Sequence, residues 1–400
     1  MGDVNAAVSL TKDRLEQGIF DWDVTKGDLD DISNAVNGLS PQERNEFIGK
    51  LSDDDLKNWT QEIDGLNGSL SAGEREDLFN KLADGLDGTQ LTRFVKAFDG
   101  SPGGRSALAD AVASHGTPEA KAAFVQSSKD SINADYSATQ GTYGNAETAA
   151  IGKVLASLGN DPAAFRQAVD SLSQDQLADV MSVAMGRRYI ADFSGQTAGT
   201  TSYEPSALVG ILDAAKGSDL DTRTAVFAAA MPQLKTMQGD NVGLLGAGAY
   251  VDDVAKAMGG VLSRAEATQA GLIDTPQAPP GVSMDANIAQ SQQHSFPQDL
   301  GWFKGQVQGK GPWDFKQQGA QYENFGNFHY GVVAAAMGIP ENVGLRAAGY
   351  AQEQAGTSRP EWGDPTDLNG GPYGDDPKDQ QQIKDGYAYY NSGLWRVWPD

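Results

Sequence analysis

The chain has no cysteine among its 400 residues and no long run of apolar residues. The first absence excludes disulfides, thiolate metal ligands and a cysteine nucleophile together. The second excludes a membrane-spanning helix, which needs about 18 consecutive apolar residues. Residues 1–5 lack the basic segment and apolar run of a cleavable signal peptide. If the protein leaves the cell, we expect a dedicated secretion system to export it without a cleaved signal peptide.

Basic side chains are also scarce, with 30 Lys and Arg against 54 Asp and Glu and a net charge of −24. Because phosphate contacts need Lys and Arg, this balance argues against nonspecific binding to nucleic acid. The charge is uneven, since the residues from Gly281 onward carry 14 acidic and 8 basic side chains. A nucleic-acid partner is therefore less favoured than an uncharged one. The residues from Gly281 onward are less acidic than those before them, so a nucleic-acid partner is disfavoured there but not excluded.

The familiar motifs of several enzyme classes are missing. There is no phosphate-cradling glycine loop, no serine nucleophile elbow and no His-rich metal motif. These absences argue against kinases, ordinary serine hydrolases and zinc peptidases. We expect no cofactor, although clustered Asp residues of the C-terminal part could hold a divalent metal.

A chain of this length predicts two or three domains. Three prolines between Asp274 and Gly281 cannot continue a helix and favour an extended linker. We therefore predict a helical trafficking or structural module at residues 1–270, a Pro-rich linker at 271–282 and an effector domain at 283–400. The first module could contain two subdomains, with a break near residues 100–145.

The first module is predicted to be helix after helix. Ser40, Pro41 and Glu43 begin one helix with an N-cap, a proline at the first helical position and an acid at the third. A similar start recurs with Ser71 and Glu74. Such recurrence is typical of helix-pair repeats, which bury their apolar faces against their neighbours. The predicted class is mostly α, as an irregular repeat array or a helical bundle, followed by a small, mainly helical and loop-rich domain.

Aromatic residues gather after the linker, where five of the seven Trp residues lie. Three segments there combine aromatic, acidic and glycine residues: 311–316 (GPWDFK), 322–331 (YENFGNFHYG) and 371–379 (GPYGDDPKD). At these segments the chain resembles the bacterial polymorphic toxin type 44 domain, from about residue 285 to residue 390. The resemblance implies an antibacterial toxin domain carried behind a variable trafficking module, with a cognate immunity protein and a secretion apparatus as partners.

We take the catalytic candidates from these segments. Glu323 is the first choice for the essential carboxyl group, with Asp376 or Asp314 as its partner and His329 holding or polarising the site. A glycoside hydrolase needs two carboxyl groups in different environments, one of which has a raised pKa. The alternative for His329 is a structural hydrogen-bonding residue. For Asp376 it is one of several acids at the start of a helix with Pro377 at its first position, where one Asp serves as the cap.

The substrate-binding candidates are polar and aromatic neighbours of those residues. Glu361 lies beside an aromatic residue, although an exposed loop position is its alternative. Asp375 and Asp379 share with Asp376 the alternative of a helix start. The complete set of substrate-binding candidates is Trp313, Asn327, Tyr330, Glu361, Asp375 and Asp379.

Three functions remain open from the sequence. The favoured one is a peptidoglycan hydrolase that cleaves the glycan strand in the periplasm of a target cell. The second is a ribonuclease acting in the target cytoplasm, with His329 as acid or base and nearby Lys residues neutralising the phosphate. The third is a noncatalytic toxin whose C-terminal domain binds a partner.

Overall fold

The computed structural model describes residues 2–16, 24–63, 70–98, 102–137, 142–190, 200–241, 248–366 and 371–399. The chain is predominantly helical, which confirms the predicted mostly-α class. It divides into two compact units, Met1–Gln233 and Leu234–Asp400. In the part of the chain that is described, no helix is long and apolar enough to cross a membrane.

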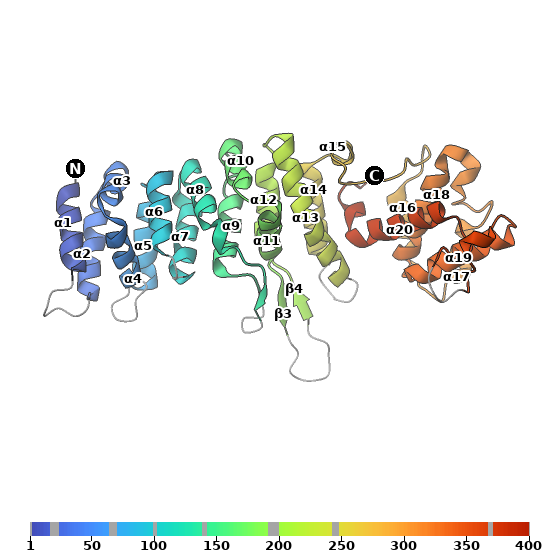
Figure 1. Ribbon diagram of the computed structural model, residues 1–400, viewed down its shortest axis with the longest axis horizontal. Coiled ribbons are helices and arrows are strands. Elements are labelled where there is room, and N and C mark those ends of the chain that lie inside the picture. The colour runs from blue at the N-terminus through green and yellow to red at the C-terminus, as the bar shows by residue number, and fades with distance from the viewer. Residues whose placement is uncertain are drawn as a thin grey trace. The chain divides into compact units, whose positions relative to one another are not determined.

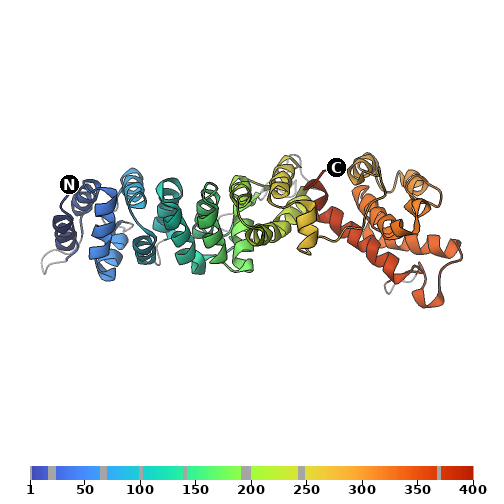
Figure 2. The same ribbon diagram turned by 90° about the horizontal axis from the view of Figure 1, so that it is seen from above.

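Unit 1 is an array of short helices that lie side by side (Figure 1). Most of them contact the helix two positions along the chain, as α5 contacts α7, α6 contacts α8 and α7 contacts α9. This pattern produces two rows of helices (Figure 2) and matches the predicted irregular repeat array. Its helices are α1 (Val4–Leu15), α2 (Lys26–Asn37), α3 (Pro41–Lys50), α4 (Asp53–Ile63), α5 (Ala72–Ala83), α6 (Gly88–Ala97), α7 (Pro102–His115), α8 (Pro118–Ser128), α9 (Ala146–Ala156), α10 (Pro162–Asp170), α11 (Gln174–Ala184), α12 (Ser206–Ala215) and α13 (Leu220–Asn241), the last of which continues into unit 2.

Four short antiparallel strands accompany these helices in the order β1-β2-β3-β4. Arg188 pairs with Thr142 on one side and Ser202 on the other. The strands are β1 (Tyr136–Ser137), β2 (Thr142–Tyr143), β3 (Arg188–Ile190) and β4 (Thr200–Ser202).

The predicted helix starts are present. The backbone N–H of Ser40 donates to the Glu43 carboxylate at 2.8 Å, and Ser71 and Glu74 repeat this capping box at 2.8 Å. Arg44 follows the first box, is buried, and donates to the Lys81 carbonyl oxygen at 2.9 Å. Local capping therefore sets where these helices begin, and a buried cation ties one repeat to the next.

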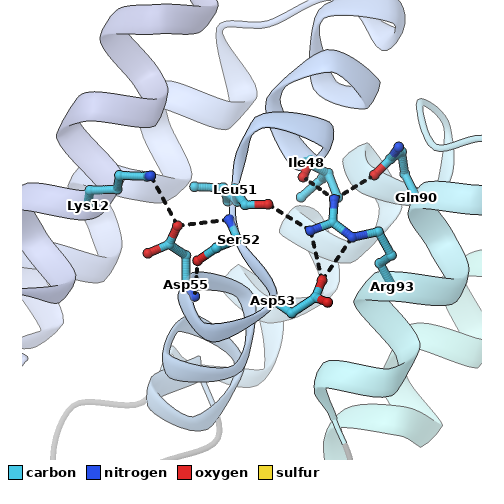
Figure 3. A network of polar contacts seen from close by, with 8 residues as sticks. All are labelled: Lys12, Ile48, Leu51, Ser52, Asp53, Asp55, Gln90 and Arg93. Atoms are coloured by element: carbon cyan, nitrogen blue, oxygen red, sulfur yellow. Dashed lines mark hydrogen bonds and ion pairs between the residues drawn. The ribbon is translucent and has the colours of Figure 1, made fainter.

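A second cation joins α3, α4 and α6 (Figure 3). The Arg93 guanidinium on α6 donates to the carbonyl oxygens of Ile48 at 3.1 Å and Leu51 at 2.7 Å, at the end of α3. It also contacts the Asp53 carboxylate at 2.8 Å, at the start of α4. The Ile48 carbonyl oxygen also accepts the Leu51 backbone N–H at 3.3 Å, whereas the Leu51 carbonyl oxygen lies beyond the end of α3 and accepts from Arg93. Arg93 thereby fixes the turn between α3 and α4.

Unit 2 contains the end of α13 and the helices that follow it. These are α14 (Gly248–Val261), α15 (Arg264–Gln269), α16 (Met284–Ser291), α17 (Leu300–Val307), α18 (Glu323–Ala336), α19 (Glu341–Gln354) and α20 (Pro377–Ser392), with the short 3-10 helices η2 (Phe315–Gln318), η3 (Ala320–Tyr322), η4 (Pro360–Trp362) and η5 (Leu394–Arg396). Their core contains Phe303, Trp313, Phe325, Val333, Leu345, Ile383 and Tyr387.

The Pro-rich segment lies within unit 2 and is not helical, as its prolines predict. Ala278 and Val282 pack against the core formed by α17–α20. The division between the units lies upstream of this segment, inside α13. Unit 2 therefore includes two helices, α14 and α15, that precede the prolines.

We predict that Arg93→Ala lowers the free energy of unfolding by about 1–3 kcal/mol, because it removes the charged donor from the Ile48 and Leu51 carbonyl oxygens and breaks the ion pair with Asp53. Urea denaturation of the full chain, followed by far-UV circular dichroism, measures the change. The exposed Lys57 provides the control, since Lys57→Ala should stay within about 0.5 kcal/mol of wild type. Equal effects of the two substitutions would show that the Arg93 contacts do not stabilise the array.

Candidate functional site

The site depends on an unusually close crossing of α18 and α20. A Cβ atom at Gly331 would lie 2.0 Å from the Ile383 carbonyl oxygen, and one at Gly386 would lie 2.1 Å from the Phe328 carbonyl oxygen. Any side chain at either position would therefore push the two backbones apart. Glycine permits this approach. The crossing brings the middle of α18 close to α20 and so to the acidic residues at the start of that helix.

A cavity of about 690 Å³ opens beside this crossing. Its walls come from α17, η2, α18, α19 and the N-terminal part of α20. Seven of the predicted site residues line it, whereas Glu323, Asp376 and Glu361 do not. The seven are Trp313, Asp314, Asn327, His329, Tyr330, Asp375 and Asp379.

The three Asp residues around the start of α20 have different roles. Asp376 caps the helix, because its carboxylate accepts the Lys378 backbone N–H at 2.9 Å. Asp375 is buried and accepts hydrogen bonds from the Gln380 side chain at 2.9 Å and the Asp376 backbone at 3.0 Å. Burial raises the pKa of Asp375. Asp376 is thus the cap and Asp379 lies in the first turn, both in accord with the helix-start alternative, while the carboxyl groups of Asp375 and Asp379 line the cavity.

Asp379 shares a cation with Glu323. The Lys316 ammonium nitrogen lies 3.2 Å from a Glu323 carboxylate oxygen and 3.7 Å from an Asp379 oxygen. The Glu323 side chain is 52% exposed and that of Asp379 only 15%, so the two acids sit in different environments. Burial raises the pKa of Asp379, and the nearby Lys316 charge opposes part of that rise. The sequence analysis did not select Lys316 as a residue of the carboxylate site, although it ends the GPWDFK segment.

His329 is enclosed by aromatic rings. The rings of Trp313, Phe315 and Phe325 lie 5.2, 4.8 and 5.7 Å from its centroid, and Asn287 contacts its Nε2 atom at 2.9 Å. Burial lowers the pKa of His329 to about 3. The imidazole is therefore neutral near pH 7 and is not a source of protons there. This geometry fits the structural alternative for His329 better than the catalytic one.

Two of the remaining cavity candidates, Tyr330 and Asp314, form hydrogen bonds that hold the walls in place. Tyr330 donates to the Gly344 carbonyl oxygen at 3.0 Å, and burial raises its pKa. Asp314 accepts the Lys310 backbone N–H at 2.7 Å, which closes the loop before η2. The Asn327 amide nitrogen is buried and has no hydrogen-bond partner among the described residues.

Glu361 is exposed in η4 and does not line the cavity, as its loop alternative predicts. Across the described ranges, no three His, Cys, Asp or Glu side chains are grouped in a way that could hold a metal ion. The cavity itself presents the carboxyl groups of Asp375 and Asp379 and the ammonium group of Lys316.

We predict that His329 makes the protein less stable as the pH falls. The pKa of His329 is about 3 in the folded state and 6.5 without burial. As the pH falls below 6.5, His329 therefore binds a proton in the unfolded chain while it stays neutral in the folded chain. At pH 5 this costs about 2 kcal/mol relative to pH 7. Melting temperatures of wild type and His329→Gln across this range test the effect, and the variant should lose this component of the pH dependence.

His294→Gln is the matched control, because His294 is partly exposed and stacks on Trp302 outside the ring cluster around His329. That variant should keep the wild-type slope. If His329→Gln and His294→Gln show the same dependence on pH as wild type, burial of neutral His329 does not control acid stability.

The comparisons with known proteins concern the C-terminal part of the chain. No curated protein and no solved structure matches the chain. Residues 290–392 match the family model described as Bacterial toxin 44. This range contains α17–α20 and nearly all of the cavity-lining segments. The match confirms the resemblance noted in the sequence and indicates that the C-terminal segment of this chain is a bacterial toxin 44 domain.

Proposed function

We propose that the toxin domain hydrolyses the glycan strand of peptidoglycan, with Asp379 as the general acid and Glu323 as the second carboxylate. The observation that carries this proposal is the pair of acids that share one lysine: Lys316 and Asp379 line the cavity, and Glu323, outside its lining, contacts the same Lys316 nitrogen. A general acid must be protonated at the working pH, and the raised pKa of Asp379 favours that state. Glu323 is exposed to solvent and lies beside the positive charge of Lys316, and both features favour its ionised form. The second carboxylate must be ionised to activate water or attack the sugar.

The separation of the two acids is compatible with this chemistry. Because both carboxylates contact the same Lys316 nitrogen, their nearest oxygens cannot be further apart than the sum of 3.2 and 3.7 Å. Retaining glycosidases use separations of about 5–5.5 Å and inverting ones about 6.5–9.5 Å. This upper limit on the distance between the Glu323 and Asp379 oxygens allows the separation of a retaining enzyme and the shortest separations of inverting enzymes.

The rest of the cavity offers aromatic surface on which the apolar face of a sugar ring can pack. Phe303 and Trp313 contribute aromatic surface to its walls, and Tyr350 lies at its edge with 57% of its surface exposed. Aromatic rings pack against the apolar faces of sugars, and few polar groups are then needed to fix orientation. Asp379 and Lys316 supply polar groups in the same cavity.

The ribonuclease alternative receives less support from the same residues. His329, its proposed acid or base, is buried and neutral. Lys316, a cation that could have faced a phosphate, is paired with two carboxylates. We therefore favour a glycan over RNA as the substrate.

The proposed activity bears on how the protein is exported, where it acts and how the producing cell is protected. We infer that a dedicated system exports the chain, that unit 1 serves in delivery, and that the toxin acts on the cell wall from the periplasm of a target bacterium. A toxin domain implies a cognate immunity protein in the producing cell. An inhibitor that covered Lys316 and Glu323 would block both carboxylates, and Glu323 is exposed enough to be reached.

The direct test is digestion of purified peptidoglycan sacculi by the full chain, with released fragments identified by mass spectrometry. Wild type should release saccharide fragments with new reducing ends. Glu323→Gln and Asp379→Asn should each slow release by at least about 100-fold, because each removes one of the two reacting carboxyl groups. Glu361→Gln, at an exposed acid outside the cavity, should keep wild-type activity.

Two results would contradict the proposal. One is the absence of new reducing ends with active preparations of the chain, including the case in which only peptide bonds are cut. The other is full activity in both Glu323→Gln and Asp379→Asn, which would place the reaction elsewhere.

The Lys316 charge also predicts a pH effect. Lys316→Met removes the cation that partly offsets burial at Asp379, so the pKa of Asp379 rises further. The acid then stays protonated to higher pH, and the alkaline limb of the activity profile should move to higher pH. Lys304→Met, at another lysine that lines the cavity, should leave that limb unmoved. A shift in the opposite direction, or equal shifts in both variants, would rule out Asp379 as the general acid.

A further inference from the structure

The C-terminal segment, residues 393–398, lies after the part of the chain that matches the toxin family. It leaves α20 at Gly393 and packs on helices that precede the Pro-rich segment. Within this segment η5 contacts α14, and Trp398 contacts the start of α15. These contacts join residues more than a hundred positions apart in the sequence, yet all of them lie within unit 2.

Trp398 makes the last of these contacts with both its backbone and its ring. Its indole N–H donates to the Leu262 carbonyl oxygen at 2.8 Å, at the end of α14. Arg264, at the start of α15, donates to the Trp398 carbonyl oxygen at 2.9 Å. The same guanidinium lies 5.9 Å from the centroid of the Trp398 ring. A tryptophan held at its N–H, its carbonyl and its ring has one defined position.

Arg396 fixes the middle of the segment. Its guanidinium forms an ion pair with Asp252 on α14 and donates to the Gln238 side chain at 3.1 Å on α13. It also lies 4.1 Å from the Trp395 ring centroid, and that ring stacks on Tyr390. Only 16% of the Arg396 side chain is exposed, so solvent weakens these interactions less than at an open surface.

The helix surface is shaped to receive the segment. A Cβ atom at Gly259 on α14 would lie 2.3 Å from the Val397 carbonyl oxygen, so only glycine lets the segment lie this close. Val397 and Leu394 are buried in this position, with 3% and 7% of their surfaces exposed. The contact therefore combines apolar burial with specific polar groups, as a stable interface does.

We propose that the surface formed by α14, α15 and the end of α13 is a binding surface whose partner is the C-terminal segment of the same chain. The segment acts as a clasp. Its noncovalent contacts keep the toxin domain attached to these helices even when the Pro-rich segment is cut. A cut in that segment then leaves a noncovalent complex, and the toxin domain is not released on its own.

The test uses the full chain with a protease recognition sequence inserted between Asp274 and Thr275, ahead of Ala278 and Val282, which pack on the toxin core. An affinity tag at the N-terminus holds the first fragment on a resin after cleavage, and the second fragment is followed in the wash. We expect the cleaved wild type to remain together. Trp398→Ala and Arg264→Ala should each release the second fragment about tenfold faster or more, which corresponds to about 1.4 kcal/mol.

Two further variants keep the test decisive. Trp398→Phe keeps a ring but loses the N–H bond to Leu262, so it should release the fragment at an intermediate rate even if Trp398→Ala fails to fold. Arg359→Ala removes a cation that lies over a different ring, Trp362, and should behave as wild type. Immediate separation of the cleaved wild-type fragments, or equal release rates in wild type, Trp398→Phe and Arg264→Ala, would overturn the proposal.

Discussion

The crossing of α18 and α20 at Gly331 and Gly386 is the constraint on which the toxin domain depends. At a larger separation, the residues of α18 that face the cavity would move away from the start of α20. Glycine at both positions costs backbone entropy in a helix, yet it lets two backbones touch. The placement of Asp375 and Asp379 beside the α18 residues that line the cavity follows from that contact.

Burial and charge oppose each other at this site. Burial raises the pKa of Asp375 and Asp379, and the Lys316 ammonium limits the effect at Asp379 while it pairs with Glu323. The result is two acids in unlike environments around one cation. That difference, more than the number of acidic residues, makes the cavity a candidate for acid/base chemistry.

The array of unit 1 uses cations differently. Arg44 and Arg93 donate to carbonyl oxygens of neighbouring helices and so link helix ends between repeats. The C-terminal clasp applies the same principle in unit 2, where Arg264 donates to a backbone carbonyl and Arg396 to side chains of α13 and α14. In a chain with far more acidic than basic residues, these few arginines hold together segments that are distant in sequence.

The sequence by itself determined the features that depend on neighbouring residues. Capping boxes at Ser40 and Ser71 predict helix starts because their hydrogen bonds span three residues, and Pro377 with acidic residues around it likewise predicts the start of α20 from a short stretch of sequence. The three toxin segments were likewise readable as ordered motifs. Only the tertiary structure decided that Lys316 joins Glu323 to Asp379 and that burial among aromatic rings keeps His329 neutral. The same holds for the packing of the C-terminal segment on α14 and α15. Each of these depends on side chains brought together from separate helices and loops, and on a burial that no local pattern specifies.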